Sequence, residues 1–146
     1  MFKKILVPVD LSHEDQILKL INVATTLAGG LDSELHLLYV DQSLIHSAGY
    51  PHLDEQRFVD HRNDAKTKMT NLLAHLPENL TGKSHCREGT AHDQILETAQ
   101  ELQVDAIAMM ARKPGISSYF IGSNAERVVR HAPCSVFVIR DVNSEA

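Results

Sequence analysis

Residues 108–126, AMMARKPGISSYFIGSNAE, hold the side chains with the clearest potential for chemistry. The segment begins as the end of an apolar, strand-like run and continues into a basic loop that contains Arg112, Lys113 and Gly115. Gly122 and Ser123 then open a helix. Free backbone N–H groups and the helix dipole attract anions at such a position. We therefore expect this segment to bind the phosphates of a nucleotide.

Ser123 has two interpretations. In the first, Gly122 lets a phosphate approach the backbone, and the hydroxyl and N–H groups of Ser123 bind it. In the second, Ser123 and Glu126 form a capping box, which is a common way to begin a helix. The cationic side chain of Arg112 beside the same loop favours the first interpretation, but the sequence leaves both open.

Two strand ends supply further candidates. Asp10 follows a buried apolar run, where an acidic residue can accept a hydrogen bond from a ribose hydroxyl. It can equally be a helix-start residue near Ser12. Val40 ends a second apolar run, where a backbone N–H and C=O can read the edge of an adenine. Core packing is the alternative for its side chain.

The remaining motifs argue against most enzyme classes. The chain has no G-x-S-x-G elbow, Walker A loop or H-E-x-x-H pair. Its 9 histidines are scattered without metal-ligand spacing, so we expect them to lie mostly at the surface. Residues 29–33, GGLDS, resemble a pyrophosphate-binding loop, but they follow a predicted helix, so we interpret them as a helix stop.

Composition indicates a single soluble domain. The chain has 146 residues, of which 43% are hydrophobic, and a net charge of −5. The acidic balance excludes nucleic acid as a main partner, and no apolar run is long enough for a membrane span. Without an export signal, we expect a cytoplasmic protein. Cys86 and Cys134 are then expected to be reduced, buried thiols.

Hydrophobic periodicity predicts alternating strands and helices. Capping boxes at Ser12–Asp15 and Thr90–Asp93 are expected to begin the first and third helices. The third strand is polar, and we expect it to be short and near a sheet edge. The expected strands are residues 3–9, 34–40, 82–88, 104–111 and 134–140, and the expected helices are residues 12–28, 54–76, 90–102 and 123–132.

This alternation predicts an α/β fold with a five-stranded parallel sheet and helices on both faces. With the strand order 3-2-1-4-5, the order reverses between the first and fourth strands, so a crevice lies at their carboxyl ends. Residues 8–10 and 110–115 leave these two strands. The last strand is an apolar edge, which predicts a homodimer through residues 135–140.

Over nearly its full length, the sequence resembles the universal stress protein family. The resemblance is carried by KILVPVDLS, LHLLYVD, EGTAHDQIL and IGSNAERVVRHAPCSVFVIR. It implies a universal stress protein domain over residues 1–141 with a short tail at 142–146, a Rossmann-type fold of the adenine nucleotide α-hydrolase kind, stress induction, dimers and bound ATP. The residues it implies near the nucleotide are Pro8, Val9 and Asp10, Val40 at the adenine, Met109 or Met110 under the ring, Gly122, Ser123 and Asn124 at the phosphates, and Ser117 and Ser118 as further phosphate contacts. Arg112 and Gly115 are part of the predicted site through their place in the basic loop.

The loop departs from the family pattern G-x2-G-x9-G-[ST]. The two earlier glycines are replaced by Met109, or Met110 if the loop is one residue shorter, and Arg112. The loop is most similar to a branch that carries a proline here and also binds ATP. A branch without the glycines is thought not to bind ATP.

We therefore expect an ATP-binding, dimeric stress regulator that turns over little or no ATP, with or without Mg²⁺. The alternative is a stress protein that binds no nucleotide and acts through protein–protein interaction. A slow ATPase has only the family's precedent, because no catalytic set is visible.

Overall fold

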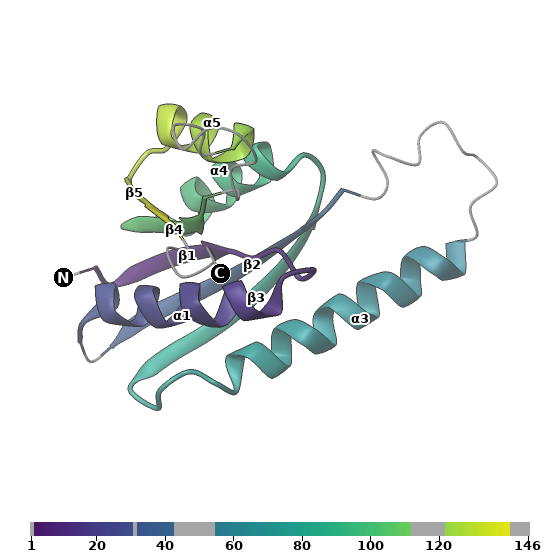
Figure 1. Cartoon of the computed structure of the whole chain (residues 1–146), viewed down its shortest axis with the longest axis horizontal. Helices are drawn as coiled ribbons and strands as arrows, with labels where there is room; N and C mark the ends of the chain where they lie inside the picture. Colours follow the sequence, from purple (N-terminus) through teal and green to yellow (C-terminus); the bar gives the residue numbers. More distant parts are fainter. Residues whose placement is uncertain (1, 31, 43–54, 112–121, 141–146) are drawn as a thin grey trace, which may run out of the picture.

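The computed structural model describes residues 2–30, 32–42, 55–111 and 122–140. Within these ranges, strands and helices alternate along the chain (Figure 1). No helix in the described ranges is both long and apolar enough to span a membrane. The elements are β1 (Lys4–Pro8), α1 (Glu14–Ala28), β2 (Ser33–Asp41), α3 (Glu55–Leu73), β3 (Leu80–Glu88), α4 (Ala91–Leu102), β4 (Ala106–Met110), α5 (Ser123–His131) and β5 (Ser135–Ile139).

The five strands form one parallel sheet in the order β3-β2-β1-β4-β5, which confirms the predicted fold. The central strand β1 pairs with β2 from Lys4↔Glu34 to Pro8↔Leu38, and with β4 at Ile5↔Ala106. From β1 the chain builds outward to β2 and β3 on one side, then returns to β4 and β5 on the other. The order therefore reverses between β1 and β4, where such sheets have their ligand crevice.

Helices cover both faces of the sheet. In Figure 1, α1 and α3 lie on one side of it, and α4 and α5 lie on the other. Ile5 and Val7 of β1 pack in the cluster on the α1 face, while Leu6 packs in the cluster on the opposite face. All three side chains are fully buried. This burial on both faces explains why the strand is a continuous apolar run.

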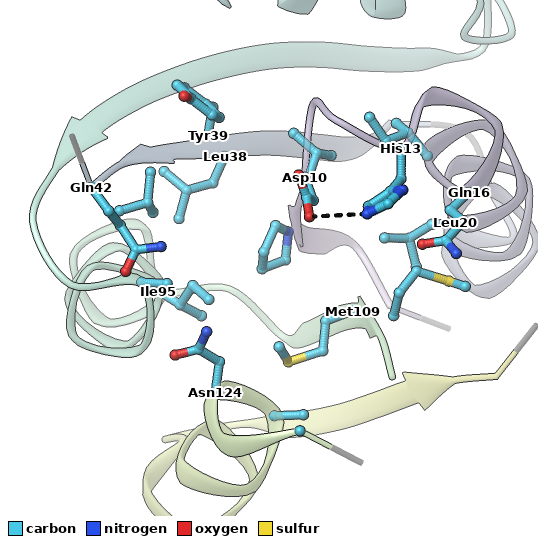
Figure 2. A pocket seen from close by; sticks show the side chains of 18 of the residues that line it. Asp10, His13, Gln16, Leu20, Leu38, Tyr39, Gln42, Ile95, Met109 and Asn124 are labelled. Atoms are coloured by element: carbon cyan, nitrogen blue, oxygen red, sulfur yellow. Dashed lines mark ion pairs between the residues drawn. The ribbon is translucent and has the colours of Figure 1, made fainter. Parts of the chain in front are cut away.

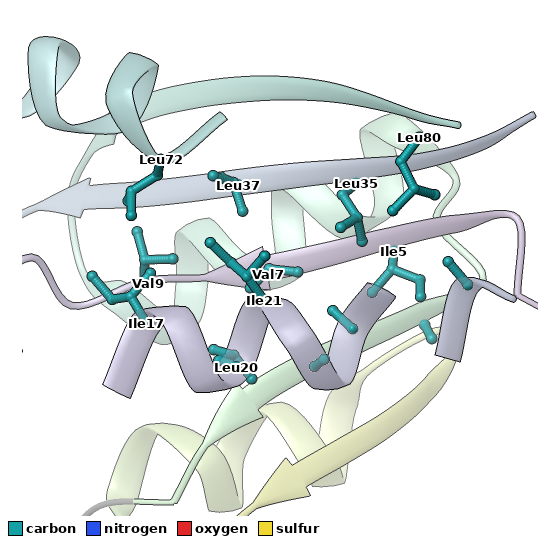
Figure 3. Packing of buried hydrophobic residues seen from close by; sticks show 14 of the residues in the cluster. Ile5, Val7, Val9, Ile17, Leu20, Ile21, Leu35, Leu37, Leu72 and Leu80 are labelled. Carbon is teal, nitrogen blue, oxygen red and sulfur yellow. The ribbon is translucent and has the colours of Figure 1, made fainter. Parts of the chain in front are cut away.

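Helix α1 packs one apolar stripe against the sheet (Figure 3). Ile17, Leu20, Ile21 and Ala24 are buried at helical spacing, and the carboxylates in the first turn complement the helix dipole. The predicted Ser12–Asp15 capping box is wrong, because the helix begins at Glu14 and its N-cap position is His13.

Thr90 is the N-cap of α4, as predicted, but its side chain makes no capping hydrogen bond. In α5, Ala125 and Val128 are buried, whereas Val129 is 49% exposed. The helix has only 9 residues, Ser123–His131, so one narrow stripe of it meets the sheet.

Strand β3 lies at the sheet edge, as predicted, but it is not short. It spans 9 residues and pairs with β2 without interruption, from Ser33↔Leu80 to Asp41↔Glu88. Its polar side chains concealed this length, because an edge strand needs no continuous apolar pattern to pair through its backbone.

Two other predictions concern single side chains. His36 is only 2% exposed, which contradicts a surface position for this histidine. Cys86 and Cys134 are free thiols, as expected, although each is half-buried rather than fully buried. Burial raises the pKa of both thiols, which keeps them protonated and poorly nucleophilic.

Candidate functional site

A cavity of about 820 Å³ lies at the carboxyl ends of the central strands (Figure 2). Strands β1, β2 and β4 form its floor, and the starts of α1, α4 and α5 form its walls. We call it the crevice. Its lining residues are Pro8, Val9, Asp10, His13, Gln16, Ile17, Leu20, Leu38, Tyr39, Val40, Asp41, Gln42, His61, Ala91, Ile95, Met109, Met110, Ala111, Gly122, Ser123, Asn124 and Ala125.

The structure brings together every predicted site residue that it describes. These residues are Pro8, Val9, Asp10, Val40, Met109, Met110, Gly122, Ser123 and Asn124, and all of them line the crevice. The other four predicted residues, Arg112, Gly115, Ser117 and Ser118, lie outside the described residues. The convergence of four separate chain segments is thus observed, while the role of each residue in binding stays a prediction.

The N-terminus of α5 opens directly into the crevice. Gly122 is the N-cap residue, with φ 104° and ψ 146°, and within the described part of the chain no side-chain hydrogen bond caps the helix. The capping box of Ser123 and Glu126 is therefore wrong, because Ser123 is already the first helical residue. The first backbone bond of the helix runs from the Glu126 N–H to the Gly122 carbonyl. The N–H groups of residues 123–125 precede that bond, so they are available to a ligand.

Asp10 stands at the opposite side of the crevice, in a tight turn between β1 and α1. The His13 N–H bonds the Asp10 carbonyl at 3.1 Å, which closes the turn. The Asp10 side chain is 72% exposed, and its Oδ2 lies 3.9 Å from His13 Nε2. Figure 2 shows the two side chains next to each other in the crevice. A carboxylate in this position can accept hydrogen bonds from a ligand's hydroxyl groups.

The end of β2 adds polar groups that sequence reasoning missed. Tyr39 Oη lies 2.9 Å from His61 Nε2, and the same nitrogen is 3.9 Å from Asp41 Oδ1. Burial, followed by the nearby carboxylates of Asp41 and Asp10, raises the pKa of Tyr39. The phenol is therefore a neutral donor and acceptor at physiological pH.

A sequence signal existed for some of these residues but not for others. Tyr39 and Asp41 flank Val40 at a predicted strand end, so the strand-end rule that selected Val40 could have included them. His61 lies in the middle of a long helix, with no local motif around it. It reaches the crevice because α3 packs along β2 and β3, where Arg62 also forms an ion pair with Glu88.

Comparison with known proteins gives the family. The family model of the universal stress protein family matches residues 1–140. Universal stress protein G from Salmonella typhimurium is 34% identical over 149 aligned positions, which cover 96% of this chain and 100% of that protein. The chain belongs to the universal stress protein family. The resemblance noted from the sequence is thereby confirmed.

Solved structures of similar proteins share the fold of this universal stress protein. The hypothetical protein MJ0577 superposes with a TM-score of 0.82 at 24% identity, covering 99% of each chain. A universal stress protein from Archaeoglobus fulgidus, solved in complex with dAMP, superposes with a TM-score of 0.68 at 19% identity, covering 93% of this chain and 96% of that one. At these identities the comparisons establish the architecture.

The methionines that replace the first glycine of the family's loop pattern lie at the crevice. Met109 and Met110 end β4 and line the crevice, with Met109 only 6% exposed. Met109 packs in the cluster on the α4 and α5 face, and Met110 contacts the cluster on the α1 face. A thioether side chain is flexible and polarisable, so both methionines can adapt their shape to a neighbouring apolar surface.

Proposed function

We propose that this universal stress protein binds an adenine nucleotide, ATP in the first instance, in the crevice, and that it acts as a cytoplasmic stress regulator. The observation that carries the proposal is the meeting of the uncapped N-terminus of α5 with Asp10 and the end of β2 around one cavity. Its volume of about 820 Å³ is within the range of small-molecule sites. The dAMP complex of the Archaeoglobus fulgidus protein supports an adenine nucleotide as the ligand class.

Each part of the ligand has a matching group. The phosphates are assigned to the backbone N–H groups of Ser123 and Asn124, where the helix dipole adds a favourable field. The sugar hydroxyls are assigned to the carboxylate of Asp10, and the adenine edge to the backbone of Val40. The apolar side chains of Met109 and Met110 are assigned to the face of the base. Mg²⁺ is expected to accompany the phosphates.

Equilibrium binding of ATP to extensively dialysed protein tests this function. Titration calorimetry with ATP and Mg²⁺ is expected to give saturable binding near one ATP per chain. Failure to saturate at millimolar ATP would overturn the proposal and favour the alternative, a stress protein that acts by protein–protein interaction alone. The replacement of both loop glycines, at Met109 or Met110 and at Arg112, is the observation that favours this alternative.

We further propose that bound nucleotide is turned over slowly or not at all. The support for this is the sequence, which carries no G-x-S-x-G elbow, Walker A loop or H-E-x-x-H pair. A phosphate-release assay on the wild type and on Asp10→Ala checks this point. Release that is rapid in the wild type and lost in the variant would make Asp10 part of a hydrolase instead.

The proposed regulator acts as a homodimer through β5. This strand is the edge of the sheet next to β4. Its residues from Val136 to Ile139 are half-buried and apolar, and Phe137 packs its ring edge-on against Phe2. An apolar edge with unpaired backbone groups favours association with a second strand.

A further inference from the structure

Ser12 makes two contacts with the carboxylate of Asp10. The Ser12 hydroxyl donates to Asp10 Oδ1 at 2.5 Å, and the Ser12 N–H donates to the same oxygen at 3.0 Å. Together with the bond from the His13 N–H to the Asp10 carbonyl, these contacts fix both the backbone and the side chain of the turn. Aspartate at the first position of such a turn commonly bonds the backbone two residues on.

The two contacts divide the roles of the carboxylate oxygens. Oδ1 already accepts two hydrogen bonds from Ser12. Oδ2 has His13 Nε2 as a neighbour at 3.9 Å, which is beyond hydrogen-bonding distance. An exposed aspartate without such a clamp samples several rotamers, and a ligand would have to pay the cost of ordering it. Ser12 orders it beforehand and leaves Oδ2 for the ligand.

We propose that Ser12 is a positioning residue that fixes Asp10 and thereby makes the crevice select nucleotides whose sugar donates a hydrogen bond from a hydroxyl group to Oδ2. This inference rests on the proposed nucleotide-binding function. An ionised carboxylate accepts hydrogen bonds and donates none. Oδ2 therefore recognises a ligand through a hydrogen bond that a hydroxyl group of the ligand donates. A sugar that lacks this hydroxyl leaves the aspartate without its partner inside the complex.

The selectivity distinguishes this role from a structural one. If Ser12 only stabilised the turn, its loss would weaken all nucleotides alike. If Ser12 positions Asp10, its loss weakens the binding of only those ligands whose hydroxyl group donates a hydrogen bond to Asp10. The difference between ATP and its deoxy analogues is therefore the informative quantity.

The test measures dissociation constants of ATP, 2′-deoxy-ATP and 3′-deoxy-ATP by equilibrium dialysis. The wild type is expected to bind ATP roughly tenfold or more tightly than at least one analogue, as for a hydrogen bond to a charged group. Ser12→Ala should weaken ATP roughly three- to tenfold and leave that analogue nearly unchanged. Ser12→Thr keeps a hydroxyl and should restore the preference. Thr26→Ala, which removes an exposed hydroxyl of α1 that bonds Asn22, is the matched control and should behave as wild type.

A double-mutant cycle adds an independent readout. In an Asp10→Asn background, Ser12→Ala should cause little further loss for ATP, because the two residues act as one unit. Equal weakening of all three nucleotides by Ser12→Ala, or a wild type that binds them equally, would overturn the inference while ATP binding itself stands. Absence of any ATP binding would overturn the inference and the proposed function together.

Discussion

At the residue scale, the backbone conformation of Gly122 limits which amino acids can occupy the start of α5 beside the crevice. Its φ of 104° and ψ of 146° lie in a region that residues with a Cβ rarely adopt. Gly122→Val is expected to cost roughly 1–3 kcal/mol in backbone strain and to place methyl groups beside the N–H groups of Ser123 and Asn124. ATP affinity should therefore fall at least about tenfold.

Gly89→Val is the matched control for this substitution. Gly89 also has a positive φ, 139°, but it does not line the crevice. Titration calorimetry and thermal melting are measured for both variants. Both should melt earlier than wild type, and only Gly122→Val should lose nucleotide. Equal ATP affinity in the two variants would remove Gly122 from the site.

The sequence predicted those site residues that can be recognised from their immediate neighbours in the chain. Gly122 starts a helix and Asp10 ends a strand, and both kinds of position can be located from neighbouring residues alone. His61 could not be found in this way, because only the packing of α3 against the sheet brings it to the crevice. The predicted capping box at Ser123 was wrong because the sequence pattern at a helix start does not distinguish the N-cap residue from the first helical residue, one position later.

At the element scale, a hydrogen-bonded histidine pair joins β2 to β3. His36 Nδ1 lies 2.9 Å from His85 Nε2, and the two rings stack with centroids 5.1 Å apart. His36 Nε2 lies 3.0 Å from Glu34 Oε2. This contact lowers the pKa of Glu34, with smaller help from the charges of Lys83 and Lys4. Burial, followed by the charges of His36, Arg87 and Lys83, lowers the pKa of His85.

Both shifts make the folded protein less stable in acid. A lowered pKa means that the unfolded chain binds the proton at a higher pH than the folded chain does, so stability falls as the pH falls. The loss begins near the ordinary value of 6.5 for His85 and near 4.5 for Glu34. Between pH 7 and pH 5, His85 therefore contributes to the dependence of stability on pH.

We accordingly expect His85→Gln to flatten the dependence of stability on pH. At pH 7 the variant should be less stable by about 1 kcal/mol, because one hydrogen bond to His36 is altered. From pH 7 to pH 5 it should lose less stability than wild type, as followed by urea midpoints at constant ionic strength. His75→Gln, which removes an exposed histidine just beyond the end of α3 and outside this network, is the matched control for the loss of one histidine. An unchanged slope in His85→Gln would contradict this account.

The same pair of strands shows where element prediction was limited. Buried strands such as β1 were recognised because both faces are apolar. The length of β3 was underestimated because its backbone pairing with β2, and not its side-chain pattern, determines how long the strand is. His36 was misplaced because burial of a histidine depends on the partners that a neighbouring strand supplies, and those partners lie almost fifty positions further along the chain.

At the scale of the whole molecule, the strand order and the position of the crevice were both predicted. Strict alternation of strand and helix leaves few topologies, because crossovers are right-handed and parallel sheets are covered on both faces. The order β3-β2-β1-β4-β5 makes β5 an edge, which is the basis for the proposed dimer.

The backbone of β5 offers a direct test of the dimer. The Ala111 N–H bonds the Ile139 carbonyl, so the backbone groups of Ile139 point toward β4 and, by alternation along the strand, those of Val138 point outward. Val138→Pro removes one outward N–H and spares the bonds to β4, a position where edge strands tolerate proline. The variant is expected to stay folded by circular dichroism and to sediment as a monomer at micromolar concentration. Val138→Thr keeps the N–H and should remain a dimer, because the proposed contact depends on backbone pairing along this edge. A wild type that sediments as a monomer, or a Val138→Pro variant that remains a dimer, would place the assembly surface elsewhere.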